Sequence, residues 1–76
     1  MTVHDLVKGR EYEVVRDFRD YYGSEFRMGE RLVFTETHFL PYHGGYTVTF
    51  GPVSMHLQEE VNAGIVDHID EYLREC

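Results

Sequence analysis

Apolar residues alternate with polar ones along much of the chain, a pattern typical of half-buried β-strands. In residues 11–18, Tyr12, Val14 and Phe18 fall on one side of the predicted strand, and in residues 30–36 Leu32 and Phe34 do the same. The alternation loses its parity before Phe39, which predicts a turn or bulge near residues 35–38. We expect a loop over residues 39–45, because this segment contains Pro41 and the pair Gly44-Gly45.

Residues 46–50 and 53–57 predict a β-hairpin across Gly51-Pro52. If only these two residues form the turn, all six apolar residues of the hairpin share one face. Proline at the second central position is disfavoured in a type I turn and requires a cis bond in a type VI turn. A loop of more than two residues is therefore the alternative. Residues 19–29 are polar and rich in aromatics, which predicts a long loop or an irregular hairpin.

Helical signals lie at the two ends of the chain. Thr2 and Asp5 have the spacing of a capping box, which predicts one helical turn within residues 2–9, with an extended arm as the alternative. Asn62 is placed to cap a helix over about residues 62–75, whose apolar stripe would lie on the sheet. The stripe consists of Ile65, Val66, Ile69, Tyr72 and Leu73.

Composition narrows the class of protein. The chain has 76 residues, 42% hydrophobic and 28% charged, as expected for one small globular domain spanning residues 1–76. The formal charge of −7 and the lack of a basic stripe argue against nucleic-acid binding and favour a basic partner, if there is one. A single cysteine, no leader-like start and no run of ~20 apolar residues predict a cytoplasmic protein without a membrane segment.

The residues that could carry chemistry do not form a catalytic pattern. Cys76 is the last residue, and Ser54 and His56 share a strand face without a third partner. The many carboxylates are typical of a solvated surface. We therefore expect neither an enzyme nor a cofactor. A metal site is the weaker alternative: His38 and His43 have a spacing found in zinc sites, but no cysteine pair accompanies them.

Aromatic residues near the two long loops are the better candidates for a binding site. The loops would bring them together if they meet at one end of a barrel, although a small barrel without tryptophan also needs aromatics to fill its core. The candidates are Tyr21, Tyr22, Phe26, Tyr42 and Tyr46.

The segment from Phe26 to Phe34, with Gly29-Glu30 at its centre and an aromatic–acidic loop before it, resembles the diverging turn of an SH3-like barrel. That resemblance implies a barrel. It does not imply the proline-rich ligand of SH3 domains, because this chain has no Trp and Pro41-Tyr42 lies in a different loop.

A second resemblance covers most of the chain up to Phe50. Gly29-Glu30 and, above all, Phe39-Leu40-Pro41-Tyr42 followed by Gly45 are similar to a family of short bacterial proteins of unknown function. This similarity implies a bacterial cytosolic origin and assigns no activity and no site residues.

Together these patterns predict a mostly β (β+α) fold: a small SH3-like antiparallel barrel or curled sheet of about five strands over about residues 10–58, with a C-terminal helix and a short N-terminal helical turn. The leading hypothesis is a noncatalytic protein-binding module, a monomer or weak homodimer, that uses the aromatic loops or the acidic face of the helix. One version is an antitoxin- or immunity-type protein that caps a basic enzyme. The alternative is a small-ligand or metal-binding barrel that uses the aromatic and histidine loops.

Overall fold

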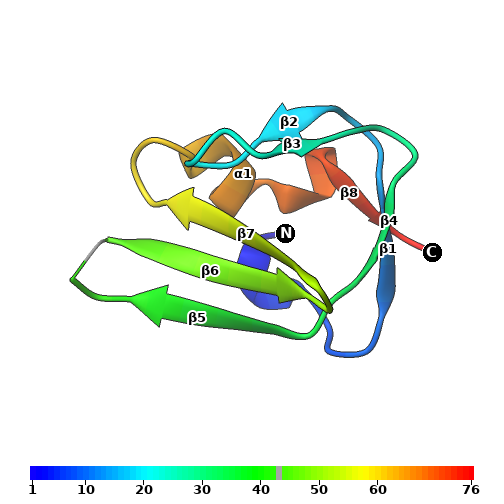
Figure 1. Ribbon diagram of the computed structural model, residues 1–76, viewed down its shortest axis with the longest axis horizontal. Coiled ribbons are helices and arrows are strands. Elements are labelled where there is room, and N and C mark those ends of the chain that lie inside the picture. Colours follow the sequence, from blue (N-terminus) through cyan, green and yellow to red (C-terminus); the bar gives the residue numbers. More distant parts are fainter. Residues whose placement is uncertain (43) are drawn as a thin grey trace.

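The computed structural model describes residues 1–42 and 44–76, in which eight short strands form three small sheets with one short α-helix and two 3₁₀ turns (Figure 1). The sheet orders are β4-β1-β8, β2-β3 and β5-β6-β7, and within the described residues they do not close into one barrel. The fold is mostly β, as predicted, but the five-strand SH3-like barrel is not confirmed. The elements are η1 (Val3–Asp5), β1 (Glu11–Val14), β2 (Phe18–Arg19), β3 (Glu25–Phe26), β4 (Arg31–Val33), β5 (Glu36–Leu40), β6 (Gly45–Phe50), β7 (Val53–Gln58), α1 (Ala63–Asp67), η2 (Ile69–Glu71) and β8 (Leu73–Glu75).

The N-terminal turn forms as the capping box predicts. The Asp5 carboxylate accepts a hydrogen bond from the Thr2 backbone N–H at 2.7 Å, and the Thr2 hydroxyl accepts one from the His4 N–H at 3.2 Å. These contacts satisfy donors that a helix start leaves unpaired. Val3, on the inner side of this turn, is buried in the core.

The C-terminal segment departs from the prediction. Instead of one helix over residues 62–75, α1 ends at Asp67 and the chain returns as β8, which pairs antiparallel with β1. Leu73 lies opposite Val14, and both side chains are buried. The apolar spacing fits a helix, but pairing with β1 decides for a strand after Tyr72 because it satisfies backbone groups that β1 would otherwise expose.

The parity break near residues 35–38 is a β-bulge. The Thr35 N–H donates to the Thr49 carbonyl at 2.8 Å while Glu36 is the register partner of Thr49, so two residues face one. The predicted loop over residues 39–45 is wrong at its start, because Phe39 and Leu40 belong to β5 and pair with β6.

The hairpin β6–β7 has the predicted two-residue turn and register, with Phe50 opposite Val53. Gly51 adopts φ +59°, which fits a type II′ turn, a type that takes glycine at the first central position and tolerates Pro52 at the second. Five of the six apolar residues are buried as expected, whereas Val53 is partly exposed beside the turn.

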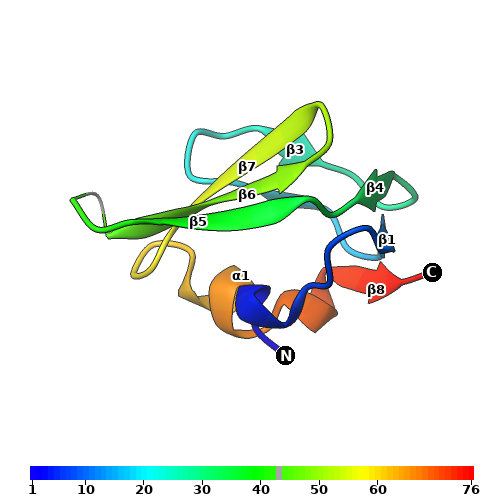
Figure 2. The same ribbon diagram turned by 90° about the horizontal axis from the view of Figure 1, so that it is seen from below.

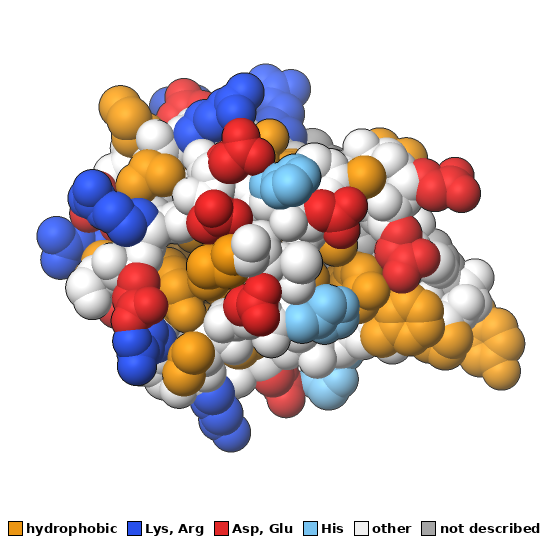
Figure 3. Space-filling view, turned by 180° about the vertical axis from the view of Figure 1, so that it is seen from behind, with side chains coloured by type: hydrophobic (Ala, Val, Ile, Leu, Met, Phe, Trp, Pro, Cys, Tyr) orange, Lys and Arg blue, Asp and Glu red, His pale blue; other side chains and the backbone are white. Residues whose placement is uncertain are grey.

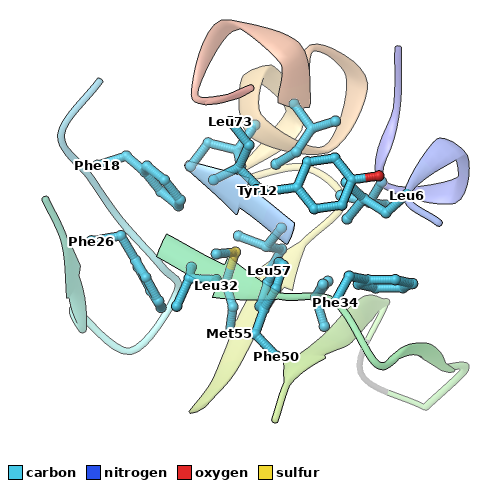
Figure 4. Close-up of a cluster of buried hydrophobic side chains, with 14 of the residues drawn as sticks. Leu6, Tyr12, Phe18, Phe26, Leu32, Phe34, Phe50, Met55, Leu57 and Leu73 are labelled. Atoms are coloured by element: carbon cyan, nitrogen blue, oxygen red, sulfur yellow. The ribbon is translucent and has the colours of Figure 1, made fainter. Parts of the chain in front are cut away.

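The core lies between the sheet β5-β6-β7 on one side and α1, η2 and β8 on the other (Figures 2 and 4). The irregular hairpin β2–β3 closes one end, where Phe18 and Phe26 stack with ring centroids 5.1 Å apart. Tyr12 is almost fully buried, and its hydroxyl accepts the Val7 backbone N–H at 2.9 Å. The other core side chains are Val3, Leu6, Val14, Leu32, Phe34, Tyr46, Val48, Phe50, Met55, Leu57, Ile65, Val66, Ile69 and Leu73.

Candidate functional site

Charge is divided unequally along the chain. Residues 32–73 contain none of the seven Lys and Arg residues but six of the fourteen acidic ones, so they carry −6 of the formal charge of −7. On the face shown in Figure 3, the Lys and Arg side chains lie on one half, and hydrophobic side chains project at the opposite end. The fold therefore has one end without cations.

The basic half is largely neutralised by local pairs. Glu25 accepts hydrogen bonds from Arg19 at 2.7 Å and from Arg27 at 2.8 Å. Arg27 is the main reason, and Arg19 the second, that the pKa of the Glu25 carboxyl lies below its ordinary value. Glu13 lies within 4 Å of Arg31 and Arg74 in a similar way. Free positive charge is thus scarce on this half.

Three connections meet at the cation-free end: the β2–β3 loop, the β5–β6 connection and the β7–α1 turn (Figure 1). We call the described residues that they place there the aromatic–acidic end. Its members are Tyr21, Tyr22, Leu40, Tyr42, Glu59, Glu60 and Val61.

Two shallow hollows share Tyr21 and Gln58 as walls at this end. One, of about 150 Å³, runs between the β2–β3 loop and the outer face of β6 and β7, beside Tyr22 and Leu40. The other, of about 250 Å³, is lined by Glu59 and Glu60 of the β7–α1 turn. Both are smaller than most small-molecule pockets and are better suited to side chains of a macromolecular partner.

A buried carboxylate holds the β2–β3 loop in place. Asp20 is 5% exposed, and its Oδ1 accepts backbone N–H bonds from Tyr22 at 3.0 Å and from Ser24 at 2.9 Å. Its Oδ2 accepts the His56 N–H of β7 at 3.1 Å, and the Tyr21 N–H donates to the His56 carbonyl at 2.7 Å. The loop is therefore fastened to the sheet, which fixes the directions of both tyrosines.

His56 contributes to the same surface. Its ring lies edge-on to Tyr22, with centroids 5.0 Å apart, and its Nδ1 lies 3.3 Å from the Thr47 hydroxyl. The sequence prediction did not include Asp20, Gln58 or His56 in the site. The spacing of Asp20 before Gly23-Ser24 is a turn signal that could have indicated Asp20, whereas only the folded structure brings His56 to Tyr22.

The predicted aromatic residues divide into two groups. Tyr21, Tyr22 and Tyr42 are exposed by 45%, 72% and 97%, all at the aromatic–acidic end. Phe26 and Tyr46 are buried and belong to the core. Burial raises the pKa of the Tyr46 phenol, and its hydrogen bond to Glu59 at 3.1 Å raises the pKa further.

The predicted metal pair is placed only in part. His38 is exposed on β5, with its Nε2 3.0 Å from the Glu36 carboxylate, and His43 lies outside the described residues. Among residues 1–42 and 44–76, no three His, Cys, Asp or Glu side chains converge in a group that could hold a metal ion.

The proposed acidic helix face does not exist as one surface. Asp67 lies in α1, whereas Asp70 lies in η2 near the N-terminal amine and Glu75 lies in β8 beside Arg10. Because α1 ends at Asp67, these carboxylates lie on three different elements. They therefore do not form one acidic surface on a helix, and the carboxylates at the aromatic–acidic end are Glu59 and Glu60.

A larger surface hollow, of about 360 Å³, lies elsewhere, over β2 and β3. Arg19 and Arg27, which line it, are already bound to Glu25, and the Asp17 carboxylate accepts the Met28 N–H at 2.6 Å. A ligand there would have to break these contacts, so the hollow is a weaker candidate despite its size.

Within the part of the chain that the structure describes, no helix combines the length and the apolar character needed to cross a lipid bilayer.

These features define a small mostly-β domain of three short sheets, with the exposed Tyr21, Tyr22 and Tyr42 at one end beside Glu59 and Glu60. The chain belongs to the family described as a domain of unknown function (DUF3601), whose family model matches residues 3–75. The predicted resemblance to a family of unknown function is thereby confirmed.

A solved structure has a closely similar fold: integron cassette protein VCH_CASS4, from the mobile metagenome of Vibrio cholerae. The two chains align with a TM-score of 0.89 and 28% sequence identity, over 93% of this chain and 88% of that one. Among curated proteins, a search found no match to this chain.

Proposed function

We propose that this domain is a noncatalytic protein-binding module whose aromatic–acidic end engages a basic, extended segment of another protein. The observation that carries the proposal is that the exposed Tyr21 lines the same hollow as the carboxylates Glu59 and Glu60, with the exposed Tyr22 and Tyr42 on the neighbouring connections and no Lys or Arg among the named residues of this end. Tyrosine faces and carboxylates are complementary to arginine and lysine side chains.

The geometry supports an extended segment rather than a compact ligand. The two hollows lie side by side across Tyr21 and Gln58, so a peptide crossing both would pass Tyr22 and then the carboxylates of Glu59 and Glu60. Because Asp20 fastens the β2–β3 loop to β7, the backbone that carries Tyr21 and Tyr22 is in place before binding, so less ordering entropy is lost there.

The proposal is tested by NMR titration of the labelled protein with a flexible peptide of alternating arginine and glycine. We expect chemical-shift changes at Tyr21, Tyr22, His56 and the β7–α1 turn, and a weaker affinity as salt rises. A peptide of alternating glutamate and glycine is the matched control and should leave the spectrum unchanged.

Two pairs of variants locate the surface. Tyr42→Ala is compared with Met28→Ala, which also truncates a strongly exposed side chain but far from this end. Glu60→Gln is compared with Glu71→Gln, which also removes one exposed carboxylate. We expect Tyr42→Ala to weaken binding about two- to fivefold and Glu60→Gln about twofold, with smaller effects of the controls.

Shift changes confined to other elements, or equal losses in the test and control variants, would contradict the proposed surface. No response to the arginine peptide, while a panel of metabolites or zinc raises the melting temperature, would favour the small-ligand alternative. The observation behind that alternative is the 150 Å³ hollow beside His56 and Tyr22.

A further inference from the structure

The sheet β5-β6-β7 has two outer edges, and the edge at β7 is covered at His56 and Gln58. The His56 N–H donates to Asp20 Oδ2, and the His56 carbonyl accepts the Tyr21 N–H. Two residues further, the Gln58 N–H donates to Asn62 Oδ1 at 2.9 Å, and the Gln58 carbonyl accepts the Asn62 N–H at 2.9 Å. Loops and side chains thus satisfy the outward backbone groups of His56 and Gln58 in β7 but not, among the residues that the structure describes, those of Ser54.

The alternation of hydrogen-bonded and non-hydrogen-bonded pairs along the sheet shows which backbone groups of β5 point outward. The Glu59 N–H donates to the Gly44 carbonyl at 3.0 Å, in register with the β6–β7 pairing. Hydrogen-bonded pairs alternate along an antiparallel ladder, so even-numbered residues of β6 bond to β7 and odd-numbered ones bond to β5. The Thr49 carbonyl, which accepts the Thr35 N–H, agrees with this assignment.

Since Thr47 of β6 is the register partner of His38, His38 bonds inward to β6. Its neighbours Thr37 and Phe39 then direct their N–H and C=O groups away from β6. No residue in the described part of the chain bonds these four groups. Phe39 is also 50% exposed, so an apolar side chain accompanies the open backbone.

We propose that β5 is a self-pairing edge, at which a second copy of this chain adds its own β5 in antiparallel orientation about a two-fold axis through His38. In this register Thr37 lies opposite Phe39 of the second copy, and Phe39 lies opposite its Thr37. All four outward backbone groups of each copy are then paired, and the two three-stranded sheets join into one of six strands.

Self-complementarity is what selects a second copy as the occupant. The outward groups are symmetric about His38, and each half-exposed Phe39 covers a threonine of the other copy, a favourable aromatic–β-branched pair. Glu36 faces Leu40 of the second copy, so the glutamates do not oppose one another. The strand also lacks lysine and proline, which commonly protect open edges, until Pro41 ends it.

Cysteine crosslinking tests the register. In a Cys76→Ser background, His38→Cys places two thiols on the axis, in a pair with Cα atoms about 4.5–5.5 Å apart, within disulfide range. The control Glu36→Cys places its thiols four residues out of register. We expect mild oxidation to convert the His38→Cys variant into a covalent dimer and to leave the Glu36→Cys variant monomeric. Equal crosslinking of both variants, or none in either, would overturn the proposal.

Sedimentation equilibrium tests the association without crosslinks. We expect the mass of the unmodified chain to rise toward twice the monomer mass with concentration, because one short strand from each copy makes a small, weak interface. Thr37→Pro removes an outward N–H and leaves the β6 ladder intact, and Phe39→Lys adds a charge at the edge. Both should stay monomeric with an unchanged circular dichroism spectrum.

A monomer at every concentration would overturn the self-pairing. Tyr42→Ala serves as the internal control, since it lies at the aromatic–acidic end and should dimerise normally. The two proposals can therefore fail separately: loss of peptide binding with intact dimerisation concerns only the aromatic–acidic end, and the reverse concerns only β5.

Discussion

The carboxylate of Asp20 lies 3.1 Å from the backbone nitrogen of His56, a residue 36 positions later in the chain. This bond joins the irregular hairpin β2–β3 to the strand β7, two elements that belong to different sheets. It also satisfies a backbone N–H at the β7 edge of the sheet β5-β6-β7 and orients Tyr21 and Tyr22. One buried side chain thus connects the fold, the covered edge and the candidate site.

Replacing Asp20 should destabilise the protein and free the β2–β3 loop from β7. Asp20→Ala leaves the N–H groups of Tyr22, Ser24 and His56 without their acceptor, and we expect a loss of about 2–3 kcal/mol in the free energy of unfolding. Urea denaturation measures it. Asp17→Ala, which removes a carboxylate that accepts one exposed N–H, is the matched control and should cost less. An equal cost for both variants would show that the burial of Asp20 is unimportant.

Gly45 is required by the close approach of β6 and β7. A Cβ at this position would lie 2.5 Å from the Leu57 carbonyl oxygen, a backbone atom that cannot move without disturbing the ladder. We expect Gly45→Ala to destabilise the protein by about 1–3 kcal/mol in thermal or urea unfolding. Gly64→Ala in α1 meets nothing within 4 Å and should be neutral or stabilise by about 0.5–1 kcal/mol.

Stability at high pH should depend on Tyr46. Its folded pKa lies above the ordinary tyrosine value, first because of burial and then because of Glu59, so the folded state favours the protonated phenol. The resulting stabilisation is present in full below a pH of about 10 and is lost as the pH rises through the folded pKa. Unfolding curves between neutral and alkaline pH should show this decline. Tyr46→Phe should remove part of the decline, whereas Tyr42→Phe, at an exposed position, should not.

Glu25 should titrate at an unusually low pH. The Arg27 hydrogen bond, followed by that of Arg19, lowers its folded pKa, so the stabilisation is present above the ordinary glutamate value of about 4.3 and is lost as the pH falls through the folded pKa. An NMR titration of the side-chain carboxyl measures this pKa directly. Arg27→Gln should move the pKa back up more than Arg19→Gln does. The effect on stability should be small because the group is exposed.

Local patterns predicted several elements correctly. The capping box of Thr2 and Asp5, the alternation of β1 and the register of β6 and β7 each follow from neighbours close in sequence, so they depend little on the rest of the fold. The expectation of a family of unknown function agrees with the family match over residues 3–75.

The conformation of the C-terminal segment depends on contacts that are distant in the sequence. The spacing of Ile69, Tyr72 and Leu73 fits a helix, yet the chain after Asp67 turns and extends because β1 offers an unpaired edge on which Leu73 is buried opposite Val14. That competition involves residues about sixty positions apart, which no local pattern contains.

The sequence by itself determined that this is one small, acidic, mostly-β domain, since composition, alternation and turn residues are properties of the chain. The tertiary structure alone decided which tyrosines are exposed, because burial depends on which elements pack together. It placed Phe26 and Tyr46 in the core and left Tyr21, Tyr22 and Tyr42 at the surface. It also decided which strand edge stays more open: the backbone of His56 in β7 bonds to the distant Asp20 and Tyr21, whereas the outward groups of Thr37 and Phe39 in β5 have no partner among residues 1–42 and 44–76.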